Sequence, residues 1–442
     1  MNVFLLLLSI ISFFLNLNAP TDLSYANKLV LCVEFVGVIL IGKMIIDGVL
    51  QSINHTYQKK LYGAFLLFLS LTLLYLHFCW TPNLSINNEN WGFDPQRYYY
   101  YATQIIRSSG FEFALNYVGV VYIYVFLMSV LGIDPLVPLF VNVLLVVLTV
   151  SIITKGIYVI YGKNSYYRYT WLFFLFPEVI YYSAVSSREI FCLALVSICI
   201  YIAASQSLDD KRTLIRIIAL IGGLLIVRPP FAAALVLALL LSPIKNKVAL
   251  GAIGFLAIVI SVIGGGLDFG SSEGAASLAD SLTEHVSGNV AASDSYNYGE
   301  NSIARRLIPH NPVEFVIFGI IRSLLYLLPK TLPFPIIASV FASSHNMGSL
   351  LGWLSSFIIM LSIPSLWGAF REFKTQDSFS RVVFTSFCVF FFVVGMLNSN
   401  LIQERYRLVY DFLLLSVWLL YKQKNKKKQN EIKRVLKKHI EK

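Results

Sequence analysis

The stretch PEVIYYSAVSSREIFCLALVSICIY, residues 177–201, organises this chain, because an arginine and a glutamate stand where a long apolar segment begins. Ser186 and Glu189 fit the S-x-x-E pattern of a capping box, in which both side chains satisfy free backbone N–H groups at a helix start. Arg188 has no such role, since a cation in the first helical turn opposes the positive end of the helix dipole. In hydrocarbon it costs about 2.5–3.5 kcal/mol on insertion scales. We therefore expect an anionic partner for Arg188.

The rest of the chain is equally apolar. Of its 442 residues, 57% are hydrophobic and only 13% are charged. Many segments are therefore long and apolar enough to span a bilayer, and they predict an all-α polytopic membrane helix bundle of roughly 11–14 spans. This integral membrane domain covers residues 1–421. Residues 1–17 resemble a signal peptide but lack a basic n-region, and Pro20 follows Ala19, so we expect them to remain as the first span.

The net charge of +11 comes mostly from the C-terminus, where residues 422–442 carry ten Lys or Arg against two Glu. We interpret this segment as a basic cytoplasmic tail near anionic lipid, and not as a nucleic-acid-binding element. The five cysteines lie in apolar runs without metal-ligand spacing, which predicts free core residues and no disulfide framework.

Basic loops recur at every second break between apolar runs, as the positive-inside rule requires of cytoplasmic loops. The segment 80–112 then lies outside, and its Asp94-Pro95 pair predicts the start of an interfacial helix that carries Tyr98 to Tyr101. If segment 80–112 is external and segment 161–168 is cytoplasmic, the chain must cross the membrane an odd number of times between them. Two apolar runs lie between these segments, which would give an even number. We therefore expect the first of these, 113–132, to be interfacial or re-entrant.

Two later segments also interrupt the pattern of spans. Residues 267–312 form the largest polar segment, which predicts a long external loop of a kind that is usually functional. The run 313–345 is broken by prolines and charges and predicts two half-helices. The chain shows no internal repeat, which weakens transporter readings.

Arginines collect at the breaks that this topology places outside, where lysine is nearly absent. The planar guanidinium fork binds phosphate oxygens bidentately, so we predict an outward-facing site for a phosphate-bearing ligand. A single arginine at a helix end more often snorkels to headgroups, and Arg407 has Asp411 four residues on as a simple partner. The predicted diphosphate-binding residues are Arg188, Arg228, Arg305, Arg306 and Arg405.

The candidates for acid–base catalysis are Asp94, His310 and Glu404. His310 follows two arginines closely, where its pKa can be tuned for a general base, whereas Asp94 also fits a simple helix cap. Arg97 and Tyr98 precede the same aromatic run, and with Glu189 they are the candidates for contacts with a glycan or the interface. The histidines show no metal-site spacing, so we predict no metal.

Three segments together resemble integral-membrane sugar transferases that use polyprenyl-linked donors. They are the loop with Asp94, Arg97 and Tyr98, the stretch VYIYVFLMSVLGIDPLVPLFVNVLLVVLTVSIITKGIYVIYGKNSYYR, and FPEVIYYSAVSSREIFCLALVSICIY, with a weaker echo in the later LIVRPP and ERYRL. Bacterial O-antigen and exopolysaccharide polymerases of the Wzy and EpsG-like types, and the wider GT-C glycosyltransferases, look similar. The resemblance implies a polyprenyl-diphosphate-linked oligosaccharide substrate, a bacterial inner membrane location with a periplasmic site, and a chain-length regulator and a flippase as partners.

The chain departs from the GT-C pattern, because two or three spans precede the aspartate loop and that loop lacks a clear pair of acidic residues. The polymerase interpretation therefore leads. The alternatives are a GT-C transferase that moves one sugar from a polyprenyl phosphate with a divalent metal, and a flippase for lipid-linked oligosaccharides. An acyltransferase would place a histidine within a membrane helix, where His77 is the loose candidate.

Overall fold

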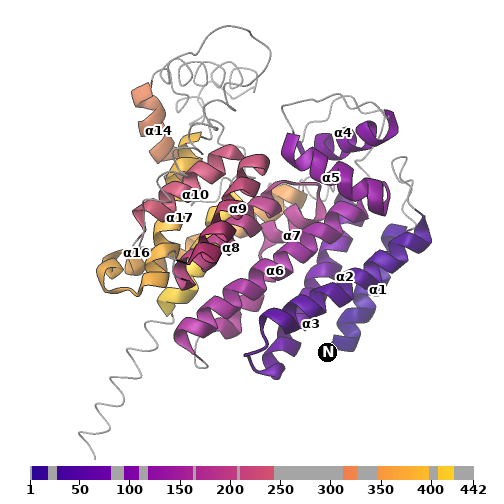
Figure 1. The fold of residues 1–442 in the computed structure, drawn as a ribbon, viewed down its shortest axis with the longest axis horizontal. Coiled ribbons are helices and arrows are strands. Elements are labelled where there is room, and N and C mark those ends of the chain that lie inside the picture. Colours follow the sequence, from indigo (N-terminus) through magenta and orange to yellow (C-terminus); the bar gives the residue numbers. More distant parts are fainter. Residues whose placement is uncertain are drawn as a thin grey trace, which may run out of the picture.

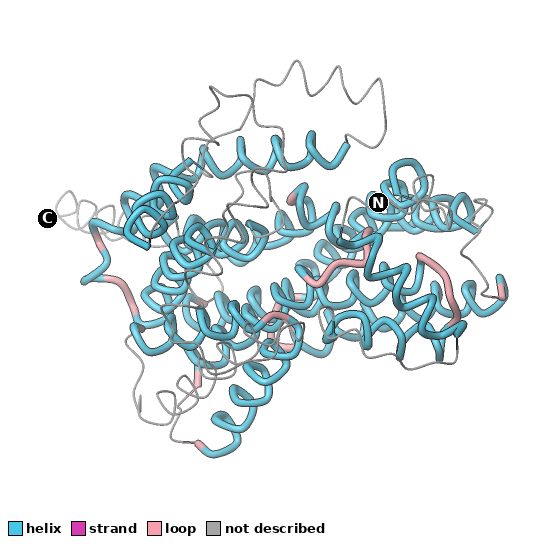
Figure 2. Tube along the Cα trace, turned by 90° about the horizontal axis from the view of Figure 1, so that it is seen from above, coloured by secondary structure: helices cyan, strands magenta, loops and turns pink. Residues whose placement is uncertain are grey.

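In a computed structural model, the described residues are 2–17, 27–80, 94–108, 118–162, 166–206, 210–242, 312–325, 347–397 and 407–422. Across these ranges the regular elements are all helices, joined by short loops (Figure 2). The described part of the chain therefore has the predicted all-α architecture. The span 247–266, nearly all of the loop 267–312 and the tail after Lys422 lie outside the described residues.

The helices follow the apolar runs, and most described boundaries differ by one or two residues, although α3 begins six residues and α17 four residues before their apolar runs. In chain order they are α1 (Asn2–Leu17), α2 (Lys28–Val49), α3 (His55–Tyr75), the π-helix η1 (Leu76–Trp80), α4 (Asp94–Ser108), α5 (Val118–Leu131), α6 (Leu136–Tyr161), the 3₁₀ helix η4 (Tyr166–Leu175), α7 (Pro177–Ala184), α8 (Glu189–Ser205), α9 (Lys211–Val227), α10 (Pro229–Leu241), α14 (Pro312–Leu325), α16 (Met347–Arg371), the 3₁₀ turn η6 (Phe373–Thr375) and α17 (Ser378–Leu397). A last helix covers 407–422.

Four helices in the described ranges are long and apolar enough to cross a membrane. They cover Lys28–Val49, His55–Cys79, Leu136–Tyr161 and Trp353–Arg371, and shorter apolar helices accompany them. In Figure 1, α1 to α3 lie on one side of the bundle, α14, α16 and α17 lie on the other with α10 beside α17, and α6 to α9 lie between them. The chain has the character of a polytopic membrane bundle.

The apolar run 169–185 does not form the single regular span that its composition predicts. Residues 166–175 are a 3₁₀ helix, and α7 begins at Pro177, which has no backbone N–H to continue the helix. The ten residues of η4 and the eight of α7 can extend about 32 Å at about 2.0 and 1.5 Å per residue. The stretched 3₁₀ geometry thus lets a short segment match a hydrocarbon core of about 30 Å.

Aromatic contacts show that η4 and α7 together run parallel to α3. Tyr57 meets Tyr167 near the start of α3, and Tyr75 meets Tyr181 at its end, with ring centroids 4.9 and 5.5 Å apart. The α7–α8 loop therefore lies at the end of the bundle where α3 finishes. We call this the Arg188 end.

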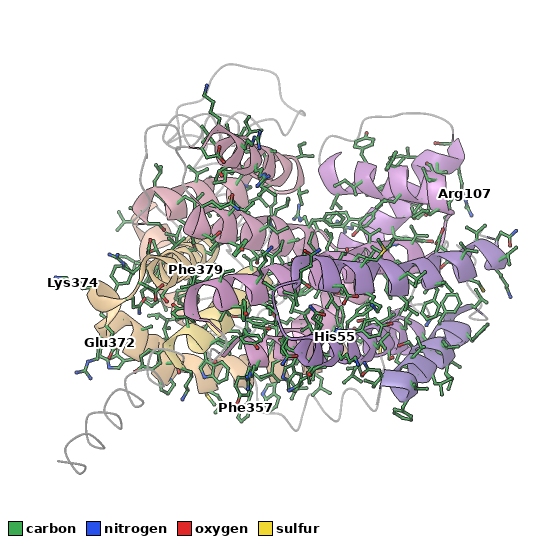
Figure 3. All side chains as sticks on the ribbon, turned by 60° about the horizontal axis from the view of Figure 1, so that its bottom comes forward. His55, Arg107, Phe357, Glu372, Lys374 and Phe379 are labelled. Carbon is green, nitrogen blue, oxygen red and sulfur yellow. The ribbon has the colours of Figure 1, made fainter. Side chains whose placement is uncertain are left out.

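The opposite end gathers the basic loops. The Tyr161 hydroxyl donates to Asp377 over 2.5 Å and lies 2.6 Å from Ser380, so the end of α6 meets the start of α17. Figure 3 shows Glu372 and Lys374 at one side of the molecule and Arg107 of α4 at the other. This distribution is the one that alternating basic loops predict.

Helix α5 lies across the Arg188 end and does not run along the bundle. Gly119, near its start, lies so close to the end of α9 that an added Cβ would stand 2.0 Å from the Ile226 carbonyl oxygen. Midway along α5, the Tyr124 hydroxyl bonds the Ser187 carbonyl, and α5 ends just before α6 begins. All three points lie at one end of the bundle, so the described part of this run, 118–131, stays at that end.

Candidate functional site

Buried side chains hold the α7–α8 loop in place. The Tyr124 hydroxyl of α5 donates to the Ser187 carbonyl over 2.9 Å, and Asn142 Nδ2 of α6 donates to the Val185 carbonyl over 2.9 Å. The Ser187 hydroxyl donates back to the Tyr182 carbonyl over 2.9 Å. These bonds satisfy backbone groups that burial would otherwise leave without partners. The loop therefore presents the following residue, Arg188, from a fixed backbone.

Two arginines meet around one carboxylate beside this loop. Arg228 Nη1 lies 3.1 Å from Glu189 Oε1, and Arg188 Nε lies 3.9 Å from the same oxygen. The side chains of Glu189 and Arg228 are only 3% and 6% exposed, whereas that of Arg188 is 22% exposed. These three groups sum to one positive charge. Arg188 is therefore the member of this trio that a ligand reaches first.

Aromatic rings lie beside both guanidinium groups. The Arg188 guanidinium carbon is 5.7 Å from the centroid of Tyr98 on α4, and that of Arg228 is 4.5 Å from the centroid of Phe231 on α10. Such cation–π contacts favour a charge in a partly desolvated place. The amphipathic α4 thus places Tyr98 over Arg188, so two predicted site residues from distant parts of the chain are in contact.

Two helix starts also converge at the arginine pair. Arg188 directly precedes α8 and Arg228 directly precedes α10, and the two helices pack against each other. The positive end of a helix dipole favours anions and adds to the charge of the two guanidinium groups. Positive groups therefore gather here, and Glu189 balances part of their charge.

The predicted capping box is wrong. Arg188 occupies the N-cap position of α8, no side chain caps this helix, and the Glu189 carboxylate faces Arg228. The full positive charge of Arg228 attracts this carboxylate more strongly than the dipole of a backbone N–H does, because burial leaves the attraction poorly screened. Glu189 is the anionic partner that Arg188 was expected to have.

The other predicted site residues are less informative. Helix α4 begins at Asp94, as the Asp94-Pro95 pair predicts, although the side chain of Asp94 is outside the described part. Arg97, one residue before Tyr98, is partly buried. Five further candidates lie outside the described residues: Arg305, Arg306, His310, Glu404 and Arg405.

Sequence reasoning missed the residues that support the site from α5 and α6. Tyr124 and Asn142 are fully buried and bind the loop backbone, but each is a single polar group in an apolar run. The only available signal was that a buried amide or phenol needs a hydrogen-bond partner. The Arg407–Asp411 pair expected within one helix is confirmed, and Lys43 contacts Asp47 at the same spacing in α2.

No three His, Cys, Asp or Glu side chains of the described ranges gather closely enough to hold a metal ion. All five cysteines are free, as predicted. Comparison with known proteins finds no matching protein family, no similar curated protein and no similar solved structure.

Proposed function

We propose that this chain is a multi-pass glycosyltransferase of the bacterial inner membrane that polymerises oligosaccharide repeat units carried on undecaprenyl diphosphate. The bundle would have roughly 11–14 spans, a cytoplasmic basic tail and a site facing the periplasm. The observation that carries this proposal is the pair Arg188 and Arg228 around Glu189, at the bundle end opposite the basic loops.

The charges and exposures of the trio suit a diphosphate. Arg188 is partly exposed and its Nε is 3.9 Å from Glu189, so its fork can turn to phosphate oxygens while the tighter Arg228–Glu189 pair persists. The net positive charge and the two helix starts attract a second anion into a place that already holds one carboxylate. Arg305, Arg306 and Arg405 are further candidates for the same diphosphate.

In the proposed reaction a sugar hydroxyl of one lipid-linked unit attacks the anomeric carbon of another. The new glycosidic bond forms as the bond from that carbon to the diphosphate oxygen breaks, and a general base accepts the hydroxyl proton. Asp94, His310 and Glu404 are the candidates for the base. Arg188 and Arg228 stabilise the negative charge on the departing diphosphate, an effect worth about 3–4 kcal/mol for one donor in comparable oxyanion sites. Arg97 and Tyr98 on α4 would contact the glycan.

A deletion strain tests the reaction class directly, because each candidate activity leaves a different surface glycan. With the gene deleted, glycan on a gel should show single-repeat caps without a ladder. An unchanged ladder, or complete loss of glycan, contradicts polymerisation. Complete loss with EDTA-sensitive transfer would indicate a single-sugar transferase, and loss with unaltered transfer in detergent would indicate a flippase.

The Arg188→Lys variant tests the role of the fork, because it keeps the charge and removes bidentate geometry. We expect polymerisation to fall by about 10²-fold. Arg212→Lys, at an exposed position in the first turn of α9, is the matched control and should retain full activity. Equal activity in both variants would contradict diphosphate binding by Arg188.

A further inference from the structure

A second charged centre lies inside the bundle, away from the arginine pair. Arg407 and Asp411, one turn apart in the last helix, are completely buried, with Arg407 Nη2 3.3 Å from Asp411 Oδ2. Arg407 Nη1 also donates to the Ser356 hydroxyl on α16 over 2.8 Å. The centre therefore connects the last helix to α16 through charged and polar groups.

The same part of α16 also binds the broken helix that leads to Arg188. Ser355, next to Ser356, accepts a hydrogen bond of 3.2 Å from the Glu178 backbone N–H. This amide belongs to the first turn of α7, directly after Pro177, where the helix starting at a break has no intrahelical acceptor for it. Two adjacent serines of α16 thus bind two different helices: Ser355 binds α7, and Ser356 binds the last helix.

Apolar packing between these elements is incomplete next to the centre, although Phe173 of η4 and Phe412 of the last helix are in contact, with ring centroids 4.4 Å apart. A groove of about 470 Å³ lies between η4, α16 and the last helix, lined by residues such as Phe173, Ile358 and Leu415. Ile358 follows Ser356 by two residues, and Leu415 follows Asp411 by four. The hydrogen-bonded centre therefore adds directional contacts to the apolar packing of these elements.

A short rigid path joins the centre to the site. Helix α7 has eight residues and is followed by the loop that Tyr124 and Asn142 anchor, which ends at Arg188. The first turn of α7, together with the Tyr124 and Asn142 anchors, therefore constrains where the Arg188 backbone lies.

Stability alone is a weak reason for this centre. Replacing a buried ion pair by apolar residues of similar volume is often neutral or stabilising, whereas removing one partner is strongly destabilising. Well-attested roles for buried polar groups are the setting of register and conformational specificity.

We propose that Arg407, together with Asp411 and Ser356, is a positioning residue that sets the placement of α7 and hence of Arg188. The part of this inference that concerns a diphosphate ligand rests on the proposed function. The geometric part, that the centre determines where Arg188 stands, is independent of it.

The test compares a broken centre with a neutral one. Arg407→Met alone leaves Asp411 without its cation and should lower the thermal unfolding midpoint of the full chain in lipid nanodiscs. Arg407→Met with Asp411→Leu removes both charges and should recover most of that loss. Binding of farnesyl diphosphate should nevertheless stay about tenfold weaker than in the parent, because small misplacements of a binding group are costly. Recovery of affinity together with stability would overturn the proposal.

A labelling arm does not depend on the ligand. Arg188→Cys is combined with the neutral pair, which is the double variant Arg407→Met with Asp411→Leu. The rate at which a cationic methanethiosulfonate modifies the cysteine at position 188 is followed by mass spectrometry. A change of at least about threefold relative to Arg188→Cys alone supports the proposal; an unchanged rate in a folded variant overturns it. The matched control replaces Lys43 and Asp47 by Met and Leu, an exposed pair with the same spacing, and should alter neither readout.

The two arms also separate this inference from the proposed function. If the parent protein does not bind farnesyl diphosphate but labelling changes, the proposed ligand is wrong and the positioning role stands. If the parent binds farnesyl diphosphate and the neutral pair changes neither its affinity nor the labelling rate, the positioning role is wrong and diphosphate binding remains supported.

Discussion

Glu189→Gln is the change that tests the charge balance of the site most directly. Glu189 and Arg228 are nearly inaccessible to solvent, and breaking a buried pair by removing one charge costs about 3–5 kcal/mol. The amide oxygen of Gln can still accept from Arg228 at 3.1 Å, and Arg188 at 3.9 Å loses little because it is partly exposed. We therefore expect the lower end of the range, about 3 kcal/mol.

An added anion should reverse this loss. With Glu189 neutral, the site holds two positive charges, so inorganic diphosphate should bind Glu189→Gln more tightly than the parent protein. At a ligand concentration of about 100 Kd, binding contributes about 2.7 kcal/mol to stability, which is similar to the loss. The assay is the Tm of the full chain in nanodiscs, followed by tryptophan fluorescence, with and without diphosphate.

Asp47→Asn is the matched control. Asp47 pairs with Lys43 on an exposed surface of α2, where such pairs contribute about 0.3–0.5 kcal/mol. Its Tm should change little and should respond to diphosphate as the parent does. If Glu189→Gln is as stable as Asp47→Asn, the buried pair does not have the expected strength. If diphosphate raises the Tm of both variants equally, the anion does not bind at Glu189.

Three further predictions concern the packing around the site and the helix cap at Asp210, the end of α9 away from Arg228. Gly119→Ala should destabilise the protein by about 1–3 kcal/mol or more, because its Cβ would lie 2.0 Å from an α9 carbonyl oxygen. Gly222→Ala, which has open space around it in α9, should instead stabilise the protein by up to about 1 kcal/mol. Thermal unfolding of both variants checks this contrast. Tyr124→Phe should cost about 1–3 kcal/mol and increase amide hydrogen exchange in the α7–α8 loop, since it removes a buried donor. Hydrogen bonds from the Thr213 hydroxyl, and to a smaller extent from backbone amides, lower the pKa of Asp210 in the folded protein. The ionised Asp210 therefore stabilises the fold fully above its unfolded pKa of about 3.9, and this stabilisation is lost as pH falls through the lower folded pKa. Acid titration of stability should therefore separate the parent from Asp210→Asn, which keeps the helix cap and lacks the titration.

Local hydropathy was sufficient to predict most helices. The apolar run 29–50 appears as α2 over Lys28–Val49, and the run 382–398 overlaps α17, which covers Ser378–Leu397. Partition of a segment into hydrocarbon depends on its own residues, so composition alone predicts it. The distribution of basic loops likewise predicted which helix ends lie together.

Composition did not predict how the run 169–185 is built. An apolar segment of that length is compatible with one regular helix, yet the structure combines a 3₁₀ helix with a short α-helix at Pro177. The choice depends on neighbours, because Ser355 supplies an acceptor to the α7 start and the rings of α3 pack along both halves. Hydropathy carries no information on such contacts.

The sequence alone established an apolar helical protein with arginines at unusual breaks, because the cost of a charge in hydrocarbon is a property of each residue and its immediate neighbours. Only the tertiary structure decided which carboxylate those arginines meet. Glu189 had a local capping role by pattern, yet it pairs with Arg228, 39 residues away. The packing of α8 against α9 and α10 brings these side chains into one water-poor place, where the charge-assisted contact outweighs the local cap.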